Sequence, residues 1–485
     1  MAKKITIEPV TRVEGHGKVT IHLDDNNQVT QSRLHIVEFR GFERFVQGRP
    51  YWEAPVLVQR LCGICPVSHH LAAAKALDVI VGAGTGDGLT PTGEKMRRLM
   101  HYGQMFQSHV LHFFHLAAPD LLFGIDGDPA MRNVIGIALT NKELAVQAVM
   151  MRKFGQEIIK ATAGKKIHGT GAIPGGINKH LTEAERDSFL NGADPMNIDK
   201  MIDWSLGALD FFKGYHKNNK DLIDKFAAYP SNHVSLVRKD GAMDFYHGVL
   251  RGIDSESNKI LDDIDYQNYL DYIDEEVKSW SYMKFPYLRS IGKKNGWYRV
   301  GPLARMNTAE FIPTPLAQKE FEIFRAYTNG KPNNMTMHQH WARLIEILHS
   351  AEMMKDLLND PDLLKGELTV KGTKGNEGVG LLEAPRGTLF HHYRINEKDQ
   401  ITMANLIVST TNNNIPMNKA VNLAAKQFMN GQTDITEGMM NAVEVAIRAY
   451  DPCLSCATHA LGKMPLEIKL IDKNENVLDR MLKNG

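Results

Sequence analysis

Four cysteines, arranged as two pairs near opposite ends of the chain, constrain this sequence more than any other feature. Cys62 and Cys65 lie in RLCGICPVSHH, Cys453 and Cys456 lie in DPCLSCATH, and the chain has no other cysteine. A spacing of three positions lets two thiolates bind one metal from a single turn, so two such pairs predict a four-sulfur metal site. Any fold that builds this site must bring the two ends of the chain together.

The two pairs leave two kinds of metal site open. A structural zinc site is the ordinary use of two such pairs, but zinc modules usually hold their pairs within a few tens of residues of each other. Here the pairs are far apart in the chain and stand among Arg, His and Asp residues. Thiolates also suit redox-active transition metals, which is the second interpretation.

Composition narrows the class of protein. The chain has 485 residues, of which 43% are hydrophobic and 23% charged, so it can bury a large core. Its 57 Lys and Arg balance 56 Asp and Glu, which gives no global field to attract nucleic acid or an anionic membrane. It lacks a signal sequence and any run of roughly twenty apolar residues, so we expect a cytoplasmic protein with no membrane partner.

Alternating apolar and polar residues in KITIEP, GKVTIHL and VTQSRLHIVEF predict a small antiparallel sheet at the N-terminus. Its first loop, TRVEGHG, carries Glu14, which is either a solvated loop acid or a functional carboxylate held close to another backbone by its glycine neighbour. Pro66 follows Cys65 and can open a helix, and SHHLAAAKALDVIV continues it with helical spacing. The first cysteine pair is therefore expected to precede a buried helix.

Most of the remaining chain has helical periodicity. We expect helices over residues 92–123, 142–160, 183–190, 199–215, 263–283, 337–358, 416–429 and 436–449, with a loop over 297–307. LLEAPRGTLFHHYRI predicts a turn that enters a strand, and Pro452 stops the last helix. The segment after His459 is expected to form a strand, which could extend the N-terminal sheet, and a short charged helix.

Several of these motifs together resemble one family. RLCGICPVSHH and DPCLSCATH, with RVEGHG, EFRGFERFVQGRP and EAPRG, resemble the large subunit of a nickel–iron hydrogenase, in the same order along the chain. CGICPVSHHLAAAKALD and HYGQMFQSHVLHFFHLAAPD are most similar to the cytoplasmic NAD-reducing, bidirectional branch. The resemblance implies an α+β, predominantly helical fold with a small N-terminal antiparallel sheet, in which residues 1–459 form one catalytic unit.

The resemblance also implies the cofactors. Cys62 and Cys453 would be terminal ligands of nickel, and Cys65 and Cys456 would bridge it to an iron that carries carbon monoxide and cyanide. A magnesium ion would be held by Glu43, His459 and a main-chain carbonyl near Asn405. His69 would orient a sulfur or a cyanide by hydrogen bonding.

In this family dihydrogen is cleaved heterolytically, so a base must accept a proton. One candidate is the thiolate of Cys453, which would pass the proton to Glu14; the other is the guanidine of Arg386. A guanidinium has a pKa above about 12, and the expected partners of Arg386, Asp120 and Asp451, would keep it charged. We therefore favour Cys453 and Glu14 as the proton route and Arg386 as an electrostatic clamp.

Partners follow from the number of thiolates. If all four cysteines bind the metals, none remains for an iron–sulfur cluster, so electrons must leave through another chain. The resemblance implies that the second chain is an iron–sulfur small subunit, which is joined to a flavin-containing diaphorase that reduces NAD. The protein described here has no dinucleotide fingerprint of its own. It also implies a maturation protease that removes residues 460–485 after nickel is inserted.

A different class of protein provides the alternative. Quinone-reactive relatives in respiratory complexes share this fold without hydrogenase chemistry, and a chain of that kind would hold at most zinc at its cysteines. Those relatives lack the cysteine pairs, whereas this chain has both pairs together with Glu14 and Arg386. The sequence therefore favours the hydrogenase interpretation.

Overall fold

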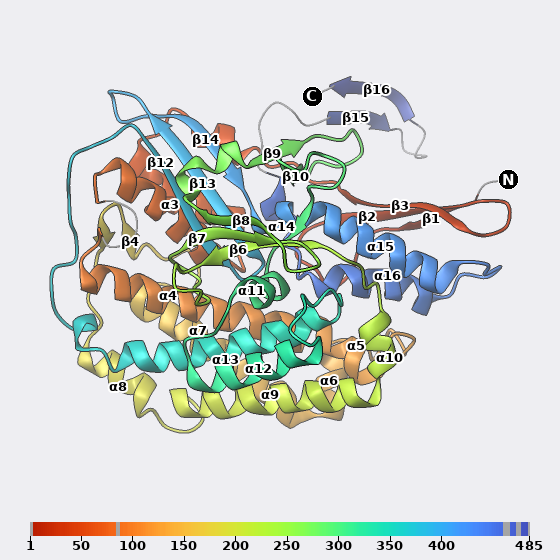
Figure 1. The fold of residues 1–485 in the computed structure, drawn as a ribbon, viewed down its shortest axis with the longest axis horizontal. Helices are drawn as coiled ribbons and strands as arrows, with labels where there is room; N and C mark the ends of the chain where they lie inside the picture. Colours follow the sequence, from red (N-terminus) through yellow and green to blue (C-terminus); the bar gives the residue numbers. More distant parts are fainter. Residues whose placement is uncertain (1–2, 84–87, 459–465, 472–476, 484–485) are drawn as a thin grey trace.

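A bundle of long helices forms the largest layer of the fold (Figure 1). The computed structural model describes residues 3–83, 88–458, 466–471 and 477–483. Within the bundle, α13 packs on α4 and α9, and α4 also packs on α7. These helices confirm four of the predicted segments; they are α4 (Pro91–Val110), which continues through a π-helical turn (Leu111–Ala117) into α5 (Ala118–Phe123), α7 (Lys142–Ala163), α9 (Ile198–Asn218) and α13 (His338–Leu358).

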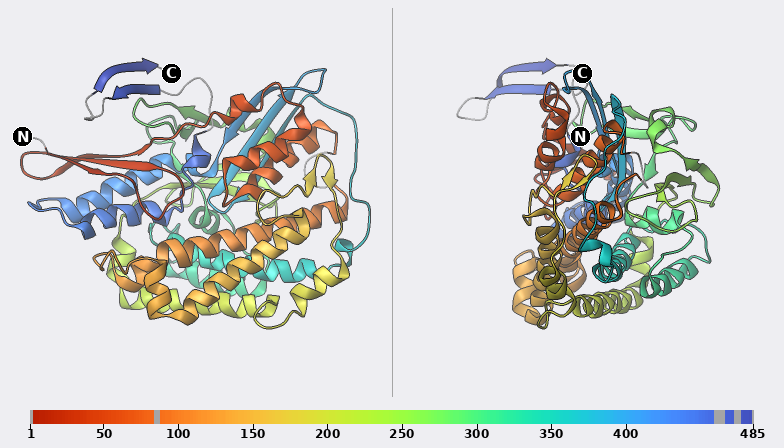
Figure 2. Two further views of the ribbon diagram at one scale, coloured as in Figure 1. Left: turned by 180° about the vertical axis from the view of Figure 1, so that it is seen from behind. Right: turned by 90° about the vertical axis from the view of Figure 1, so that its left-hand side faces the viewer.

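Two sheets lie on the side of the molecule opposite α9 (Figure 2). One has the order β12-β13-β14, and the other has the order β11-β6-β7-β8. All neighbours in these sheets are antiparallel except β11 and β6. The strands are β6 (Asn232–Val237), β7 (Val249–Ile253), β8 (Lys259–Ile264), β11 (Tyr298–Arg299), β12 (Glu377–Ala384), β13 (Gly387–Ile395) and β14 (Ile401–Ile407).

Helix α3 (Pro66–Ile80), the predicted helix after the first cysteine pair, packs directly on β12 and β13. Two glycines of β12 permit this approach. A Cβ atom at Gly380 would lie 2.0 Å from the carbonyl oxygen of Ala72, and one at Gly378 would lie 2.2 Å from that of Ala76. Because only glycine fits there, the sheet fixes α3, and with it the cysteine at the start of α3.

The N-terminal strands form the predicted antiparallel sheet. β1 (Lys3–Ile7), β2 (Gly17–Leu23) and β3 (Val29–Ile36) pair in sequence order, and α15 (Asn414–Met429) packs on β3. With this sheet in place the fold is the expected α+β architecture, predominantly helical. No helix in the described part of the chain is both long and apolar enough to cross a membrane.

Three local predictions are wrong. Residues 263–283 contain no α-helix, because Ile273 pairs with Leu288 in a hairpin of β9 (Ile273–Glu276) and β10 (Phe285–Leu288), and strand pairing overrides helical periodicity. The expected loop over 297–307 contains β11 and α11 (Pro302–Thr308). The tail forms two strands, β15 (Leu466–Ile471) and β16 (Val477–Lys483), which pair with each other and, among the described strands, not with the N-terminal sheet.

The other elements connect these layers. The predicted helices over 183–190 and 436–449 are confirmed as α8 and α16. The elements are α1 (Phe42–Phe45), α2 (Ala54–Leu57), α6 (Val134–Thr140), α8 (Glu183–Leu190), α10 (Lys220–Lys225), α12 (Pro315–Tyr327), α14 (Ser409–Asn412), α16 (Glu437–Ala449), β4 (Ala172–Ile173) and β5 (Gly176–Ile177), with 3-10 turns at Tyr51–Glu53, Val58–Leu61, Tyr266–Asp271, Pro361–Leu363 and Ser455–Ala457.

A buried ion network joins the helical layer to the sheets. Arg305 on α11 donates two hydrogen bonds of 2.6 Å to Glu346 on α13 and one of 2.7 Å to Glu383 on β12. All three side chains are 0% exposed. Burial raises the pKa of Glu346, but the charge and hydrogen bonds of Arg305 lower it to about 2. Glu346 therefore stays ionised, whereas burial raises the pKa of Glu383 even though Arg305 lowers it, and each member depends on its partners.

We expect Arg305→Met to destabilise the chain by about 3–5 kcal/mol, because it leaves two buried carboxylates without their cation. Lys355→Met is the matched control: Lys355 pairs with Asp199 at the surface, so its loss should cost less than about 1 kcal/mol. Urea unfolding at equal metal content measures both. Equal midpoints for the two variants would show that the network does not stabilise the junction.

Candidate metal centre

The first cysteine pair is held at the start of α3. Cys65 is the N-cap residue and Pro66 occupies the first helical turn, where its missing N–H is not needed. Cys62 is extended, with φ −147° and ψ 140°. The main-chain amides of Ile64 and Cys65 donate to the Cys62 sulfur at 3.2 and 3.1 Å, which favours its thiolate form.

The second pair follows the end of α16. The Cys453 amide donates to the Thr410 hydroxyl at 3.0 Å. Cys453 also forms a parallel bridge with Glu14, in which the Leu454 amide donates to the Glu14 carbonyl at 3.0 Å. Backbone hydrogen bonding therefore joins the loop after β1 to the segment that carries the second pair.

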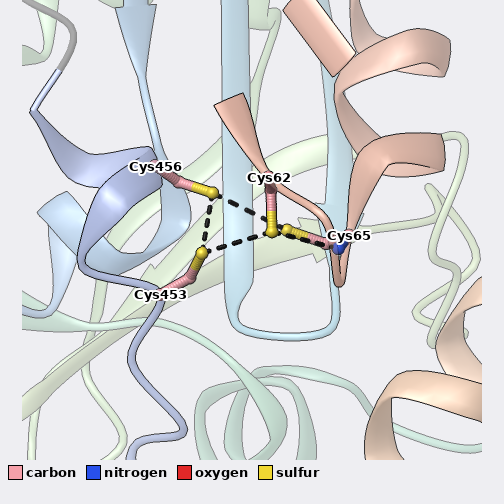
Figure 3. Close-up of side chains that lie close together, drawn as sticks. All are labelled: Cys62, Cys65, Cys453 and Cys456. Carbon is pink, nitrogen blue, oxygen red and sulfur yellow. Dashed lines mark hydrogen bonds between the residues drawn. The ribbon is translucent and has the colours of Figure 1, made fainter. Parts of the chain in front are cut away.

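The four sulfurs converge on one point (Figure 3). They lie within 4.8 Å of one another, with 3.3 Å between Cys62 and Cys453, 4.0 Å between Cys65 and Cys456, and 2.7 Å between Cys453 and Cys456. All four are buried, and none forms a disulfide. Four unoxidised, buried thiols aimed at one another are a donor set for soft metals, so the residues fit a thiolate-bound metal centre.

A small cavity of about 10 Å³ adjoins the sulfurs. It is lined by Cys65, Ser68, His69, Ala384, Arg386, Leu389, Val408, Ser409, Thr410, Cys453 and Cys456. The space suits a ligand of a few atoms and excludes larger molecules.

Arg386 provides the positive charge beside the sulfurs. Its Nε donates to the Asp451 carbonyl at 2.6 Å, and its Nη2 donates to Asp451 Oδ1 at 3.0 Å. Burial lowers the pKa of Arg386, but the negative charges of Asp451 and of the cysteines raise it well above its ordinary value. Among the described residues, Nη1 of Arg386 has no hydrogen-bond partner. Arg386 is therefore a fixed cation whose Nη1 group can still donate a hydrogen bond at the cavity.

The cysteines do not ionise alike. Burial raises the pKa of Cys453 and Cys456 well above the ordinary value for a thiol. Burial also raises the pKa of Cys62, but hydrogen bonds from the other cysteines, together with the charge of Arg386, lower it well below that value. The protein alone therefore keeps protons on some of the thiols, and a bound cation would displace them.

Glu14 contacts the second pair directly. Its Oε2 accepts from the Cys453 sulfur at 2.9 Å and from the Ser455 amide at 3.1 Å. A Cβ atom at Gly15, whose φ is 79°, would lie 2.7 Å from the Ser455 nitrogen, so glycine is needed beside the acid. The structure thus places Glu14 at the centre, as its functional interpretation requires.

Asp120 occupies a different place from the expected one. It accepts from Asn441 at 3.1 Å and from Arg448 at 3.0 Å, and it pairs with Arg12, whereas the hydrogen bonds of Arg386 go to Asp451. The expectation that Asp120 pairs with Arg386 therefore fails. Arg12 precedes Glu14 in its loop and Arg448 lies in the last turn of α16, so Asp120 connects the two segments that meet at the centre.

Two residues that sequence reasoning missed stand behind His69. His69 Nδ1 lies 3.1 Å from His391 Nε2, and His391 Nδ1 lies 2.7 Å from the Tyr393 hydroxyl. Leu389, His391 and Tyr393 occupy every second position of β13 and therefore share one face of the strand. This alternation was the sequence signal that could have placed His391 and Tyr393 near His69. The chain of contacts fixes the orientation of the His69 ring at the cavity.

The expected magnesium ligands are only partly described. Glu43 is 5% exposed, and its Oε1 accepts from the Leu406 amide at 2.8 Å, one residue from the carbonyl expected near Asn405. The Thr458 carbonyl accepts from the amides of Arg40 and Gly41, which brings the segment after the second cysteine pair to the loop before Glu43. His459 lies outside the described residues.

A second group with metal-ligand chemistry consists of His216, Asp224 and His338. Asn333 Oδ1 accepts from the Met335 amide, so its amide nitrogen faces His338 Nδ1 at 2.8 Å and donates to it. His338 Nε2 then carries the proton and donates to Asp224 at 3.1 Å. This group is a hydrogen-bonded cluster rather than a second metal site.

Comparisons with known proteins agree with this fold and site. A model of the nickel-dependent hydrogenases matches residues 40–126 and 233–459, and a HoxL-like model matches residues 4–39. The chain therefore belongs to the nickel-dependent hydrogenase family, and the four-cysteine cluster fits the nickel–iron site of that family. It is the catalytic subunit, and the structural, zinc-binding alternative is not favoured.

Individual relatives refine this assignment. The chain is 54% identical over 485 residues to the NAD-reducing hydrogenase HoxS subunit beta of Cupriavidus necator, with 99% of each chain covered. It is 42% identical over 462 residues to a chain of the F420-non-reducing hydrogenase of Methanothermobacter thermautotrophicus, covering 94% of this chain and 95% of that one.

Solved structures show the same fold. A crystal structure of an NAD⁺-reducing NiFe hydrogenase in the H2-reduced state superimposes with a TM-score of 0.91 at 52% identity, covering 94% of this chain and 99% of that one. The Ni-Fe-Se hydrogenase of Desulfomicrobium baculatum, at 24% identity, shares the fold with a TM-score of 0.74 over 94% of this chain and 100% of that one.

We expect Cys62→Ser and Cys456→Ser each to abolish nickel binding and dihydrogen turnover, because each removes one thiolate from a soft-metal site. Ser68→Ala is the control: it lines the same cavity, and its hydroxyl has no hydrogen-bond partner among the described residues, so nickel should be retained. Metal analysis of the purified variants measures the effect. Normal nickel content in either cysteine variant would exclude a four-thiolate site.

Proposed function

We propose that this catalytic subunit works in a complex that couples dihydrogen to NAD. The support is the 54% identity over the whole chain to a subunit of an NAD-reducing hydrogenase. All four cysteines lie at one site, which leaves none for an iron–sulfur cluster. Electrons therefore pass first to an iron–sulfur small subunit, then to a flavin-containing diaphorase. A complex that reduces NAD works where that pool is, which we take to be the cytoplasm.

The cysteines would hold the metals as the family resemblance implies. Cys62 and Cys453 would hold nickel, and Cys65 and Cys456 would hold both nickel and an iron that carries carbon monoxide and cyanide. When bound, this centre supplies the chemistry that polarises and splits dihydrogen. His69, held by His391, lines the cavity and is suited to donate to a sulfur or to a cyanide.

Magnesium would lie behind this centre, bound by Glu43, His459 and a main-chain carbonyl of β14 near Asn405. A buried carboxylate facing a strand backbone provides the oxygen donors that this ion prefers.

The proton leaves through Cys453 and Glu14. Their contact of 2.9 Å is a hydrogen bond within reach of direct proton transfer. Arg386, whose charge is locked by Asp451, acts as an electrostatic clamp at the cavity rather than as the base. Asp120 supports the route indirectly by holding Arg12, two positions before Glu14.

Beyond Glu14, the route continues toward solvent. The Ser455 amide donates to Glu14, and the Ser455 hydroxyl donates to Glu38 at 3.1 Å. Glu38 in turn pairs with His16, whose side chain is 67% exposed. Ser455 thus binds both the Glu14 and the Glu38 carboxylates, and Glu38 and His16 are the titratable groups on this side of Glu14 that can accept a proton toward the surface.

We expect Glu14→Gln to keep the metals and stop proton traffic, because an amide preserves shape but cannot shuttle protons. Dihydrogen/deuterium exchange should fall at least about a hundredfold, while the infrared bands of the diatomic ligands persist. Glu8→Gln, an exposed acid on the same segment, should leave exchange unchanged. Unchanged exchange in Glu14→Gln would make Glu14 an ordinary loop acid.

We also propose that residues 460–485 are an extension that a dedicated protease removes after nickel insertion. The family match ends at residue 459, and the solved NAD⁺-reducing relative covers 94% of this chain, whereas the full-length sequence relative covers 99%. Late closure would let the second cysteine pair arrive after the metal.

Intact mass of the active enzyme from its native host tests this maturation. The mass should correspond to a chain that ends at His459, and nickel-starved cells should accumulate the full-length, inactive chain. A full-length chain that is loaded with nickel and active would contradict the proposal.

A further inference from the structure

A pocket whose lining contains no cysteine gathers positive charge. It has a volume of about 430 Å³, within the range of small-molecule sites. Four separate segments build it: β3, the loop before β10, the loop before β11 and one face of α15. Its lining residues are Gln31, Ser32, Arg33, Lys278, Trp280, Phe285, Lys293, Lys294, Trp297, Ile415, Asn418, Lys419 and Asn422.

The charge of this lining is one-sided. It contains five cations and no carboxylate, in a chain whose net charge is only +1. Among the described residues, one of the five cations forms an ion pair, since Lys278 lies 3.5 Å from Glu276, and Lys293 interacts electrostatically with Asp274. Five cations in a concave site with so few acidic partners attract an anion.

Lys419 is the cation of this lining whose ammonium group is disfavoured by burial. It is partly buried on α15, and no carboxylate in the described part of the chain pairs with it. Burial lowers its pKa. A bound anion would restore the lost solvation of the ammonium group.

Two tryptophans give the pocket flat apolar surfaces beside the cations. The Arg33 guanidinium lies 5.2 Å from the centre of the Trp280 ring, and the Lys419 ammonium lies 4.3 Å from that of Trp297. A stacked guanidinium and indole can receive a planar ring as a third layer. Asn422 and Gln31 add side-chain amides that can read polar ring edges.

We propose that this pocket binds a nucleotide, with its phosphates on Lys293, Lys294 and Lys419 and its base against Trp280 and Arg33. Phosphate oxygens match the ammonium groups, and a base matches the aromatic wall. The lining contains no glycine, so lysine side chains from different segments would bind the phosphates in place of a glycine-rich loop. It is separate from the four-cysteine centre, so it serves binding rather than the cleavage of dihydrogen.

Photoaffinity labelling of the purified complex with 8-azido-ADP tests the proposal and separates this site from any nucleotide site on a partner chain. Peptides that contain Trp280, Trp297 or Lys419 should carry the label. Excess ADP should suppress labelling, whereas adenosine or inorganic phosphate should need at least about tenfold higher concentration to do so.

Lys293→Gln combined with Lys294→Gln should lower labelling of these peptides by about tenfold or more, because it removes two phosphate donors at the surface without altering the core. Lys165→Gln with Lys398→Gln removes two exposed lysines outside the pocket and should leave labelling unchanged. Absence of label from these peptides, equal labelling of both double variants, or competition by inorganic phosphate as strong as that by ADP would each overturn the proposal.

Discussion

Four thiolates from opposite ends of the chain must meet at one buried point, and the rest of the structure is arranged around that requirement. The first pair is fixed because α3 lies against glycines of β12, which sets the position of Cys65. The second pair is fixed by a backbone bridge between Glu14 and Cys453 and by bonds from Arg40 and Gly41 to Thr458. The loops next to the N-terminal sheet therefore hold the second cysteine pair in place.

The same arrangement solves an electrostatic problem. Several thiolates in a dry interior repel one another, and burial disfavours each of them. Arg386 opposes this with a charge that Asp451 holds in place. Asp120 pairs with both Arg12 and Arg448 and so joins the loop of Glu14 to the last turn of α16, where Glu444 supplies a second carboxylate to Arg448. A bound metal cation would add the positive charge that four thiolates need beyond the single charge of Arg386.

The features that could be predicted from the sequence are those that short, contiguous motifs encode. The cysteines, Glu14 and Arg386 stand in short patterns, and the long helices have clear periodicity, so these were predictable. The partner of Asp120 and the role of His391 were not, because both depend on which strands and helices become neighbours. The helix expected over residues 263–283 failed for the same reason: Ile273 finds Leu288 across a hairpin, and no local pattern shows this. The cationic pocket is likewise assembled from four distant segments.

X-ray absorption at the nickel edge of the purified, active complex measures whether all four cysteines bind a nickel-containing centre. We expect about one nickel per chain with a shell of about four sulfur ligands and no zinc in its place. Zinc alone at the site, or nickel coordinated only by nitrogen and oxygen, would rule out a four-cysteine nickel centre.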